Sequence, residues 1–373
     1  MKKQNILKIL TPPIGEDGCW WYRVKNFANI ANQEKLASVQ EIKANDNDAL
    51  VEAAFDACDA LLYRFASESI VKVVKVFKKK YPHKPVILET DDDLFNISPL
   101  SNSYANFGTK EVFLPDGTPL WQQGKAKFDL YENRKRLIDY EFCLSQSDLV
   151  LTTTIRLANK LKEYNEAVAV IPNAINFDFW PALDIKKETG VVNMVYAGGA
   201  SHFEDLMMVK EALLKLMETY PQLHLHFVGQ LFGGVKKGLP KSRVHFWPWV
   251  KADGHGYRMA CINADIAIAP LEDKEFNRNK SSVKFYEYSA LKIPSVVSNV
   301  PPYADDVQEK VNGLLFKTPD EFMRKVSALI DDPLLRRELG ENAYAWVKEH
   351  RDVKVIAKDW VEVIKKTVEA MKK

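Results

Sequence analysis

Two successive series of short apolar, β-branched runs alternate with helical patterns along this 373-residue chain, and this alternation limits its fold more than any other feature. It is typical of parallel sheets joined by crossover helices. The first series predicts strands at Ile6–Leu10, Val39–Ile42, Ala60–Tyr63, Val86–Thr90, Leu149–Thr153 and Val168–Ile171. The second predicts strands at Met194–Ala197, Leu223–Val228, Val244–Phe246, Ile266–Ala269, Ser295–Ser298 and Gly313–Phe316. Each series can form one Rossmann-like, doubly wound α/β domain.

The domain boundary is predicted where this alternation stops. Residues 172–181 break the pattern with Asn, Pro and aromatic residues, and a charged stretch follows to Gly190. We expect a first domain at residues 1–180, a second at 181–345 and a helical tail at 346–373. Such a tail can pack on one domain or cross back to the N-terminal domain.

The first domain contains an insertion at residues 94–124 that lacks a strong period. Its Leu114–Thr118 segment contains Asp-Gly, which predicts a turn and a β-hairpin. A long excursion after a strand's carboxyl end is where open α/β sheets place ligand-binding loops. A surface loop without function is the alternative.

Composition excludes several classes of protein. The chain has 52 Lys and Arg against 50 Asp and Glu, so the net charge of +2 gives no support to a dedicated nucleic-acid binder. The four cysteines form no C-x-x-C pair, which indicates reduced thiols and a cytoplasmic location. Neither a signal peptide nor a run of about 20 apolar residues is apparent, so we expect a soluble or at most peripheral protein.

The segment from Phe276 to Ser298 is the most informative part of the sequence. A helix is expected to open at Ser281 or Ser282, where unpaired backbone N–H groups and the helix dipole favour an anion. Arg278, Lys280 and Lys284 flank that start, and this combination indicates phosphate binding. Glu287, one turn later, is placed to accept ribose hydroxyls. The alternative is a capped helix with an ordinary Lys284–Glu287 surface pair.

A second candidate turn opens the second series. Gly198 and Gly199 would let backbone approach a ligand, and His202 could donate a hydrogen bond to a phosphate or accept one from a sugar hydroxyl. A tight strand-to-helix turn with a Ser cap explains the same residues.

In the first series, acidic residues follow the fourth strand. Asp91, Asp92 and Asp93 can position an acceptor hydroxyl, act as its base, cap a turn or bind a metal.

Arg23, at the first helix, can meet a phosphate or pair with a carboxylate. Trp20 and Trp21 are sugar-stacking platforms or core residues.

Several of these segments together resemble the retaining glycosyltransferases of GT-B architecture, group 1 or family 4-like. Glu287, the run Pro294 to Ser298 and Asn312 to Leu315 match the family's donor-site pattern, and Ile171–Ile175 resembles its interdomain junction. The resemblance covers nearly the whole chain. It implies two Rossmann-like domains facing a cleft, no obligatory metal or cofactor, and a UDP- or GDP-sugar as co-substrate. It also implies that Gly15 and Gly18 belong to a flexible first loop near the reaction centre.

The sequence departs from the family pattern at two positions. Asn279 stands where the family has the first of two Glu residues, and Lys292 stands at a place usually held by Gly. The first departure bears on how the sugar ring is held, not on whether a diphosphate is bound.

The leading hypothesis is therefore a hexosyltransferase-type enzyme. Its diphosphate would lie at Gly199, the Lys280–Ser282 helix start and Lys284, with Glu287 on the ribose and Asp91 to Asp93 on the acceptor side. The acceptor is unknown and carries a glycan, lipid-linked or nucleic-acid hydroxyl. One alternative is a non-catalytic nucleotide-sugar-binding protein, which the missing Glu at 279 permits.

Another alternative keeps the enzyme but makes its acceptor a hydroxylated nucleic-acid base. DNA contact would need the basic run at Lys72–Lys80 together with Lys125, Lys127, Arg134, Lys135 and Arg136. The same Lys72–Lys80 helix could lie on anionic lipid, or it could be the solvated outer face of a Rossmann helix.

Overall fold

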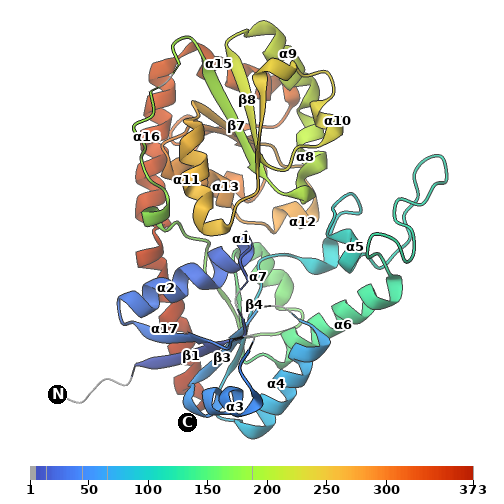
Figure 1. Ribbon diagram of the computed structural model, residues 1–373, viewed down its shortest axis with the longest axis vertical. Coiled ribbons are helices and arrows are strands. Elements are labelled where there is room, and N and C mark those ends of the chain that lie inside the picture. Colours follow the sequence, from blue (N-terminus) through green and yellow to red (C-terminus); the bar gives the residue numbers. More distant parts are fainter. Residues whose placement is uncertain (1–5, 14, 44, 65, 187, 373) are drawn as a thin grey trace. The chain divides into compact units, whose positions relative to one another are not determined.

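The computed structural model describes residues 6–13, 15–43, 45–64, 66–186 and 188–372. The chain divides into two compact units, which Figure 1 shows in sequence colours. Unit 1 contains Met1–Pro99, Ser103–Asn173 and Val353–Lys373, and unit 2 contains Leu100–Asn102 and Ala174–Asp352. The division thus falls after Asn173 rather than after Trp180, and the segment that joins unit 1 begins at Val353 rather than at residue 346.

Unit 1 is built on a parallel six-stranded sheet of order β2-β1-β3-β4-β5-β6. Its strands are β1 (Leu7–Thr11), β2 (Ala37–Glu41), β3 (Ala60–Tyr63), β4 (Val86–Glu89), β5 (Leu149–Thr152) and β6 (Val168–Val170). The strand order reverses between β1 and β3, and ligands bind outside the carboxyl ends of strands at such a switch point. The six strands lie where the sequence predicted them, with β2 beginning two residues earlier.

The helices of unit 1 include the crossover connections between its strands and one helix from the C-terminal segment. They are α1 (Gly18–Trp20), a π-helical turn (Trp21–Lys25), α2 (Asn26–Gln33), α3 (Asp48–Ala57), α4 (Glu68–Lys80), α5 (Tyr104–Phe107), α6 (Leu130–Gln146), α7 (Ile155–Leu161) and α17 (Val353–Met371), with a 3₁₀ turn at Leu94–Asn96. The sequence pattern also predicts a long helix near Gly124–Ser145, but this helix begins only at Leu130. Gly124, Ala126 and Lys127 have positive φ angles of 74°, 50° and 66°, which an α-helix excludes, and Asp129 caps the helix that follows.

The C-terminal helix α17 belongs to unit 1, where it packs on α2. Trp360 is fully buried and stacks on Phe27 with ring centroids 5.9 Å apart. The apolar spacing of this helix predicted a packed face, but not which domain would receive it. Within the described part of the chain, no helix is both long and apolar enough to cross a membrane.

The insertion forms a short hairpin turn of the kind its Asp-Gly pair predicted. Leu114 N–H donates to Thr118 O (2.8 Å), Gly117 has φ 82°, and a single antiparallel bridge joins Phe113 to Pro119. No regular strand flanks the turn in the described residues of the insertion. The side chain of Phe113 is more than half exposed.

Unit 2 has a second parallel sheet, of order β12-β11-β10-β7-β8-β9. Its strands are β7 (Val192–Gly198), β8 (Leu223–Gly229), β9 (Val244–Pro248), β10 (Ile266–Ala269), β11 (Ser295–Ser298) and β12 (Leu314–Phe316). All six were predicted from the sequence. Here the strand order reverses between β7 and β10, so the carboxyl ends of those two strands form the switch point.

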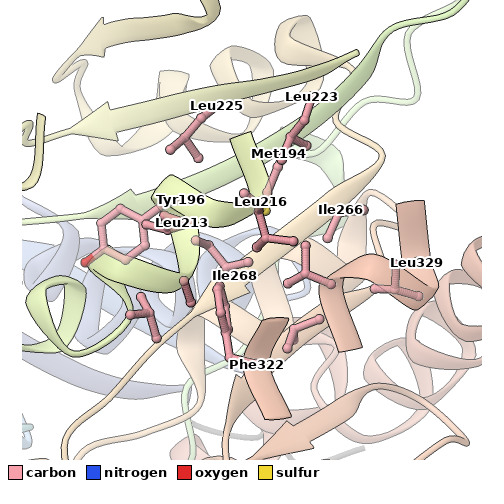
Figure 2. Packing of buried hydrophobic residues seen from close by; sticks show 14 of the residues in the cluster. Met194, Tyr196, Leu213, Leu216, Leu223, Leu225, Ile266, Ile268, Phe322 and Leu329 are labelled. Atoms are coloured by element: carbon pink, nitrogen blue, oxygen red, sulfur yellow. The ribbon is translucent and has the colours of Figure 1, made fainter. Parts of the chain in front are cut away.

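Several helices of unit 2 pack against a core of aliphatic and aromatic side chains. The helices of this unit are α8 (Phe203–Met208), α9 (Lys210–Thr219), α10 (Gly233–Lys236), α11 (Ala252–Ile262), α12 (Glu275–Arg278), α13 (Val283–Ala290), α14 (Tyr303–Asp306), α15 (Pro319–Asp331) and α16 (Pro333–His350), with 3₁₀ turns at Phe177–Phe179, Ala200–His202 and Lys241–Arg243. Figure 2 shows Leu213 and Leu216 of α9 meeting Met194 and Ile268 of the sheet and Phe322 of α15. The sequence pattern predicts one helix near Phe203–Thr219, but the structure has two, α8 and α9, with an interruption at Val209. The short helix α12 was not predicted.

Gly340 allows α16 to lie close to the chain that follows α13. A Cβ at this position would be 2.1 Å from the carbonyl oxygen of Lys292, which is backbone and cannot rotate away. Gly340→Ala should therefore force α16 away from this contact and destabilise unit 2 by about 1–3 kcal/mol, the usual cost of overpacking. Urea unfolding followed by circular dichroism measures this change. The matched change Glu341→Ala, next to it on the exposed face, should have little effect, and equal stability of both variants would contradict the close approach.

Candidate functional site

The switch point of unit 2 brings two separate segments of the sequence together. The first follows β7 and contains Gly199 and the 3₁₀ turn that ends at His202. The second follows β10, runs through α12 and enters α13. Both segments were singled out from the sequence, and the strand order explains why they meet: β7 and β10 are neighbours although 67 residues separate Ala269 from His202 along the chain.

Helix α13 is hydrogen-bonded to both β7 and β10 through one side chain. The hydroxyl of Tyr288 accepts a hydrogen bond from Ala197 N–H of β7 (3.1 Å) and lies 3.3 Å from Ile268 O of β10, to which it donates. Ser282 precedes the helix and donates its hydroxyl to Pro302 O (3.0 Å). These bonds fix the start of α13 relative to the carboxyl ends of the sheet.

A chain of three polar side chains connects α13 with α8. Lys284 Nζ lies 2.9 Å from His202 Nε2, and His202 Nδ1 lies 2.7 Å from Asp205 Oδ2. The other carboxylate oxygen of Asp205 accepts hydrogen bonds from Glu272 N–H (2.8 Å) and from the Asn277 amide (3.1 Å). His202 and Asp205 are both buried.

The pKa shifts of these three side chains indicate that His202 is neutral and that Lys284 carries the positive charge. Burial, and after it the charges of Lys284 and Lys280, lower the pKa of His202 to about 3, so the imidazole is neutral at pH 7. Burial and the charge of Lys280 also lower the pKa of Lys284 to about 8, although Asp205 and Glu287 oppose the shift. For Asp205, burial alone would raise the pKa, but the interactions with His202, the hydrogen bond from Glu272 N–H and the charge of Lys280 together outweigh burial, and the pKa lies below its ordinary value.

Glu287 lies on α13 one turn after Lys284. Its side chain is 9 % exposed, and Oε2 is 3.5 Å from Nε2 of His255 on α11. His255 in turn meets the edge of Trp180, with ring centroids 5.7 Å apart. Asn279, at the place where the resembled family has its first Glu, ends α12 and is buried.

The remaining residues predicted at this site lie in different environments. Lys280 is partly buried, with its ammonium 4.7 Å from the centre of the Phe276 ring, and Ser281 is partly exposed. Arg278 forms a two-point ion pair with Asp273 at 2.5 and 2.9 Å, on an exposed surface. Among the described residues, neither Lys280 nor Lys284 forms an ion pair with a carboxylate. The structure therefore leaves Lys280 and Lys284 as the uncompensated cations of this site.

Unit 1 has its own polar cluster at the carboxyl ends of its strands. Arg23, from the π-helical turn, donates Nε to Glu89 Oε1 (2.6 Å) and Nη1 to Ile171 O (2.7 Å). Arg64, directly after β3, donates to Glu89 Oε2 (3.0 Å) and to Asp91 Oδ1 (2.5 Å). Arg23 and Glu89 are fully buried. The structure thus places Arg23 in the carboxylate pair that was one of its two sequence interpretations.

The three consecutive aspartates after β4 have different surroundings. Burial would raise the pKa of Asp91, but its ion pair with Arg64 and the nearby charge of Arg23 hold that pKa below the ordinary range. The Asp91 charge, followed by burial, raises the pKa of Cys19 well above its usual value, so this thiol is not a nucleophile at neutral pH. Asp93 is buried and accepts a hydrogen bond from Asn96 Nδ2 (2.8 Å), whereas Asp92 is partly exposed.

The first loop of unit 1 is shaped by its packing. A Cβ at Gly15 would lie 2.3 Å from the Trp20 indole, whereas one at Gly18 would meet no atom within 4 Å. Trp20 and Trp21 are buried, so of the two interpretations the structure shows them as core residues.

Sequence reasoning missed three residues of these clusters. Arg64 could have been found from its position, because it directly follows a strand beside the switch point of unit 1. Asp205 stands three residues after His202, which is the spacing of side chains that meet on one helical turn. Tyr288 carries no sequence signal beyond a buried helical position.

No metal centre accompanies either cluster in the residues that the structure describes: no three His, Cys, Asp or Glu side chains are grouped as ligands. His224 and His226 of β8 lie beside His245 of β9 as strand residues. All four cysteines are free thiols.

The fold is shared with solved structures over almost the whole chain. Sucrose-phosphate synthase from Thermosynechococcus elongatus matches with a TM-score of 0.65 and 14% identity, covering 98% of this chain and 100% of that one. Anabaena HepE in complex with UDP and glucose matches with a TM-score of 0.61 and 13% identity, covering 96% and 100%. A glycosyltransferase from Rickettsia africae matches with a TM-score of 0.61 and 12% identity, covering 98% and 99%. The two doubly wound units therefore form the GT-B architecture, as the sequence resemblance implied.

The second unit also matches a family by sequence. Residues 192–332, which include β7, the His202 turn and α13, match the model of the glycosyl transferases group 1. Unit 2 thus contains a group 1 glycosyl transferase domain, and the chain is by class a glycosyltransferase. This bears out the enzyme class expected from the sequence.

Proposed function

We propose that this protein transfers a sugar from a nucleotide-diphosphate sugar to an acceptor hydroxyl with retention of anomeric configuration. The observation that carries the proposal is the pair Lys280 and Lys284, two cations without carboxylate partners at the switch point of a group 1 glycosyl transferase domain. A departing diphosphate needs fixed positive charge and hydrogen-bond donors as its own charge develops. Preformed cations supply this stabilisation without reorganisation during the reaction.

The donor would be held by residues from both segments of the switch point. Gly199 and the backbone at Ser281 and Ser282 would approach the diphosphate, and Lys280 and Lys284 would neutralise it. His202 would contact the diphosphate or the sugar, and Glu287 would accept the ribose hydroxyls. Arg278 would contribute only after leaving Asp273, so we assign it a secondary role.

UDP-sugars are the first donors to test. The HepE structures contain UDP or UDP-glucose, and they share the fold of this chain. A thermal-shift panel of UDP- and GDP-sugars should give a stabilising hit, because a ligand that binds only the folded state raises the melting temperature. No stabilisation by any nucleotide sugar at millimolar concentration would contradict the proposal.

On the acceptor side we propose the aspartates after β4, with Asp92 as the one to test first. Asp93 is buried, whereas the side chain of Asp92 is partly exposed. Gly15, Gly18 and the rest of the first loop would lie near the acceptor.

Transfer must be separated from binding alone. Release of free UDP in the presence of an acceptor extract, with the product's anomeric configuration read by NMR, supports a retaining transferase. A pure binding protein would shift its melting temperature without releasing nucleotide. Steep salt dependence of binding to DNA would instead favour a nucleic-acid acceptor.

Replacing Glu287 tests the ribose assignment. Glu287→Ala should weaken UDP binding by about tenfold, the order expected for lost hydrogen bonds to a charged group, and should weaken inorganic pyrophosphate binding much less. Isothermal titration calorimetry with both ligands measures the contrast. Equal losses for UDP and pyrophosphate would argue that Glu287 supports the fold rather than the ribose.

A further inference from the structure

The hydrogen bonds that connect α8 with α13 have fixed donors and acceptors, which follow from the positions of the atoms. Asp205 Oδ1 already accepts from Glu272 N–H and from the Asn277 amide, so Oδ2 faces His202 Nδ1 at 2.7 Å. An ionised carboxylate only accepts hydrogen bonds, so the proton of the neutral imidazole must lie on Nδ1. The unprotonated Nε2 then faces Lys284 Nζ at 2.9 Å and accepts from it.

This arrangement holds a cation without neutralising it. A lysine that pairs with a carboxylate has no net charge left to offer an anion, whereas one bonded to a neutral imidazole keeps its full charge. The charged groups that act on Lys284 are Lys280 before α13, Glu287 one turn later and Asp205 behind the imidazole. Lys280 repels Lys284, while the two carboxylates act through space rather than as ion-pair partners.

We propose that Asp205 and His202 are positioning residues for Lys284, which they hold as an uncompensated ammonium aimed at the diphosphate of the donor. Asp205 fixes the tautomer of His202, and His202 fixes the position of the ammonium. The inference rests on the proposed function, because it presupposes that a nucleoside diphosphate binds at the switch point of unit 2.

A proton linkage follows from this geometry. The pKa of Lys284 is about 8 in the free protein, so the ammonium is present below pH 8 and is lost as the pH rises above it. A bound diphosphate stabilises the charged form and raises that pKa. Diphosphate affinity should therefore change little near pH 7 and fall as the pH rises above 8. In the pH range where the affinity falls, diphosphate binding should be accompanied by proton uptake.

Asp205→Asn tests the hydrogen bonds that connect Asp205, His202 and Lys284, because it replaces one carboxylate oxygen with an amide NH₂ group. The new amide NH₂ cannot face Glu272 N–H and Asn277, which are both donors, so it must face His202. His202 Nδ1 then becomes the acceptor, the proton moves to Nε2, and two N–H groups oppose each other at Lys284. Nitrogen-15 spectra of the histidine side chain should report this change of tautomer directly.

The expected readout is a displaced pH profile. Calorimetry with UDP from pH 7 to 9.5, where the terminal phosphate (second pKa about 6) remains ionised, should show the D205N midpoint at least about one unit below that of the wild type. With the midpoint moved from about pH 8 to about pH 7, affinity should fall by about fivefold at pH 8 and by about tenfold at pH 9, which is the same one-unit shift expressed as binding. A purely structural role of Asp205 would lower affinity at every pH and leave the midpoint in place.

Three further variants guard the interpretation. Glu204→Gln removes a neighbouring carboxylate of α8 that pairs with Lys274, and it should leave the profile unchanged. His202→Gln keeps an acceptor for Lys284, whereas His202→Asn keeps only the donor to Asp205, so H202N should lose affinity and H202Q should retain most of it. If D205N does not fold, the comparison of H202Q with H202N tests by itself whether His202 positions Lys284.

Two outcomes overturn the inference and are distinguishable. Wild-type protein that binds neither UDP nor inorganic pyrophosphate overturns the proposed function and this inference with it. Wild-type binding combined with an unmoved D205N midpoint, or with equal affinities of H202Q and H202N, overturns the inference alone.

Discussion

Replacing Lys284 with alanine is expected to weaken UDP binding by about 10- to 100-fold at pH 7 and to reduce turnover by at least as much. A hydrogen bond to a charged group contributes about 1.5–3 kcal/mol, and removing one donor to a developing negative charge lowers kcat by about 10²–10³. The lysine is suited to this role because its ammonium faces the neutral His202 rather than a carboxylate. Calorimetry and steady-state kinetics measure the two effects separately.

The pH dependence gives this prediction a second, independent readout. Below pH 8 wild-type Lys284 is charged, and above it the charge and the affinity are lost together. Lys284→Ala should be weak but independent of pH between 7 and 9. Lys284→Arg should keep its affinity at pH 9, because the guanidinium does not deprotonate in that range.

Lys292→Ala is the matched control for these measurements. Lys292 follows the same helix but pairs with Glu341 at 2.8 Å on the surface, so its removal should leave UDP binding intact. Unchanged affinity and turnover in Lys284→Ala would exclude the switch point of unit 2 as the diphosphate site.

Replacing Arg23 with methionine is expected to destabilise unit 1 by about 3–5 kcal/mol. This is the usual loss when one partner of a buried ion pair is removed and the other charge stays behind. Arg23 and Glu89 are fully buried, and Arg23 also donates to Ile171 O and to Asn173 Oδ1. Glu89 would retain only Arg64, which it shares with Asp91. Urea denaturation followed by circular dichroism measures the loss.

A double variant separates lost charge compensation from lost packing. Arg23→Met with Glu89→Leu should be less destabilised than Arg23→Met alone, because no uncompensated carboxylate remains in the core. The exposed pair Lys72–Glu68 supplies the control: Lys72→Ala should have little measurable effect, since both side chains are more than half exposed. A single variant as stable as this control would show that the Arg23–Glu89 pair is dispensable.

The strands were predictable because their signal is local. Ala60–Tyr63 and Ser295–Ser298 read as strands from four consecutive buried positions, and both bounds agree with the structure. Helix starts were harder. The Gly124–Asp129 segment has a helical composition, but three positive φ angles delay α6 to Leu130. No Pro or Gly marks the interruption at Val209, whose side chain is fully buried in the core of unit 2.

The candidate site was predictable in part. Lys284, Glu287 and His202 were singled out because a helix start, a Gly turn and basic residues are each recognisable in a short window, and the structure brings Lys284 and His202 together. The contacts between residues far apart in the sequence were not predicted. Arg64 and Asp91 are 27 positions apart, and Asp205 and Asn277 are 72 positions apart, so nothing in a local window indicates that they touch.

Two parallel sheets with crossover helices, and basic residues around the start of α13, could be predicted from the amino-acid sequence, because strand periodicity and helix-start chemistry are properties of neighbouring residues. Which of those basic residues keep an uncompensated charge depends on contacts that form only in the folded protein. Strand order placed His202 beside Lys284 and Arg64 beside Glu89, and burial then set which charges are neutralised. Arg23 is neutralised in a buried ion pair with Glu89, whereas Lys284 has no carboxylate partner. This difference depends on contacts between residues far apart in the sequence, which no local pattern encodes.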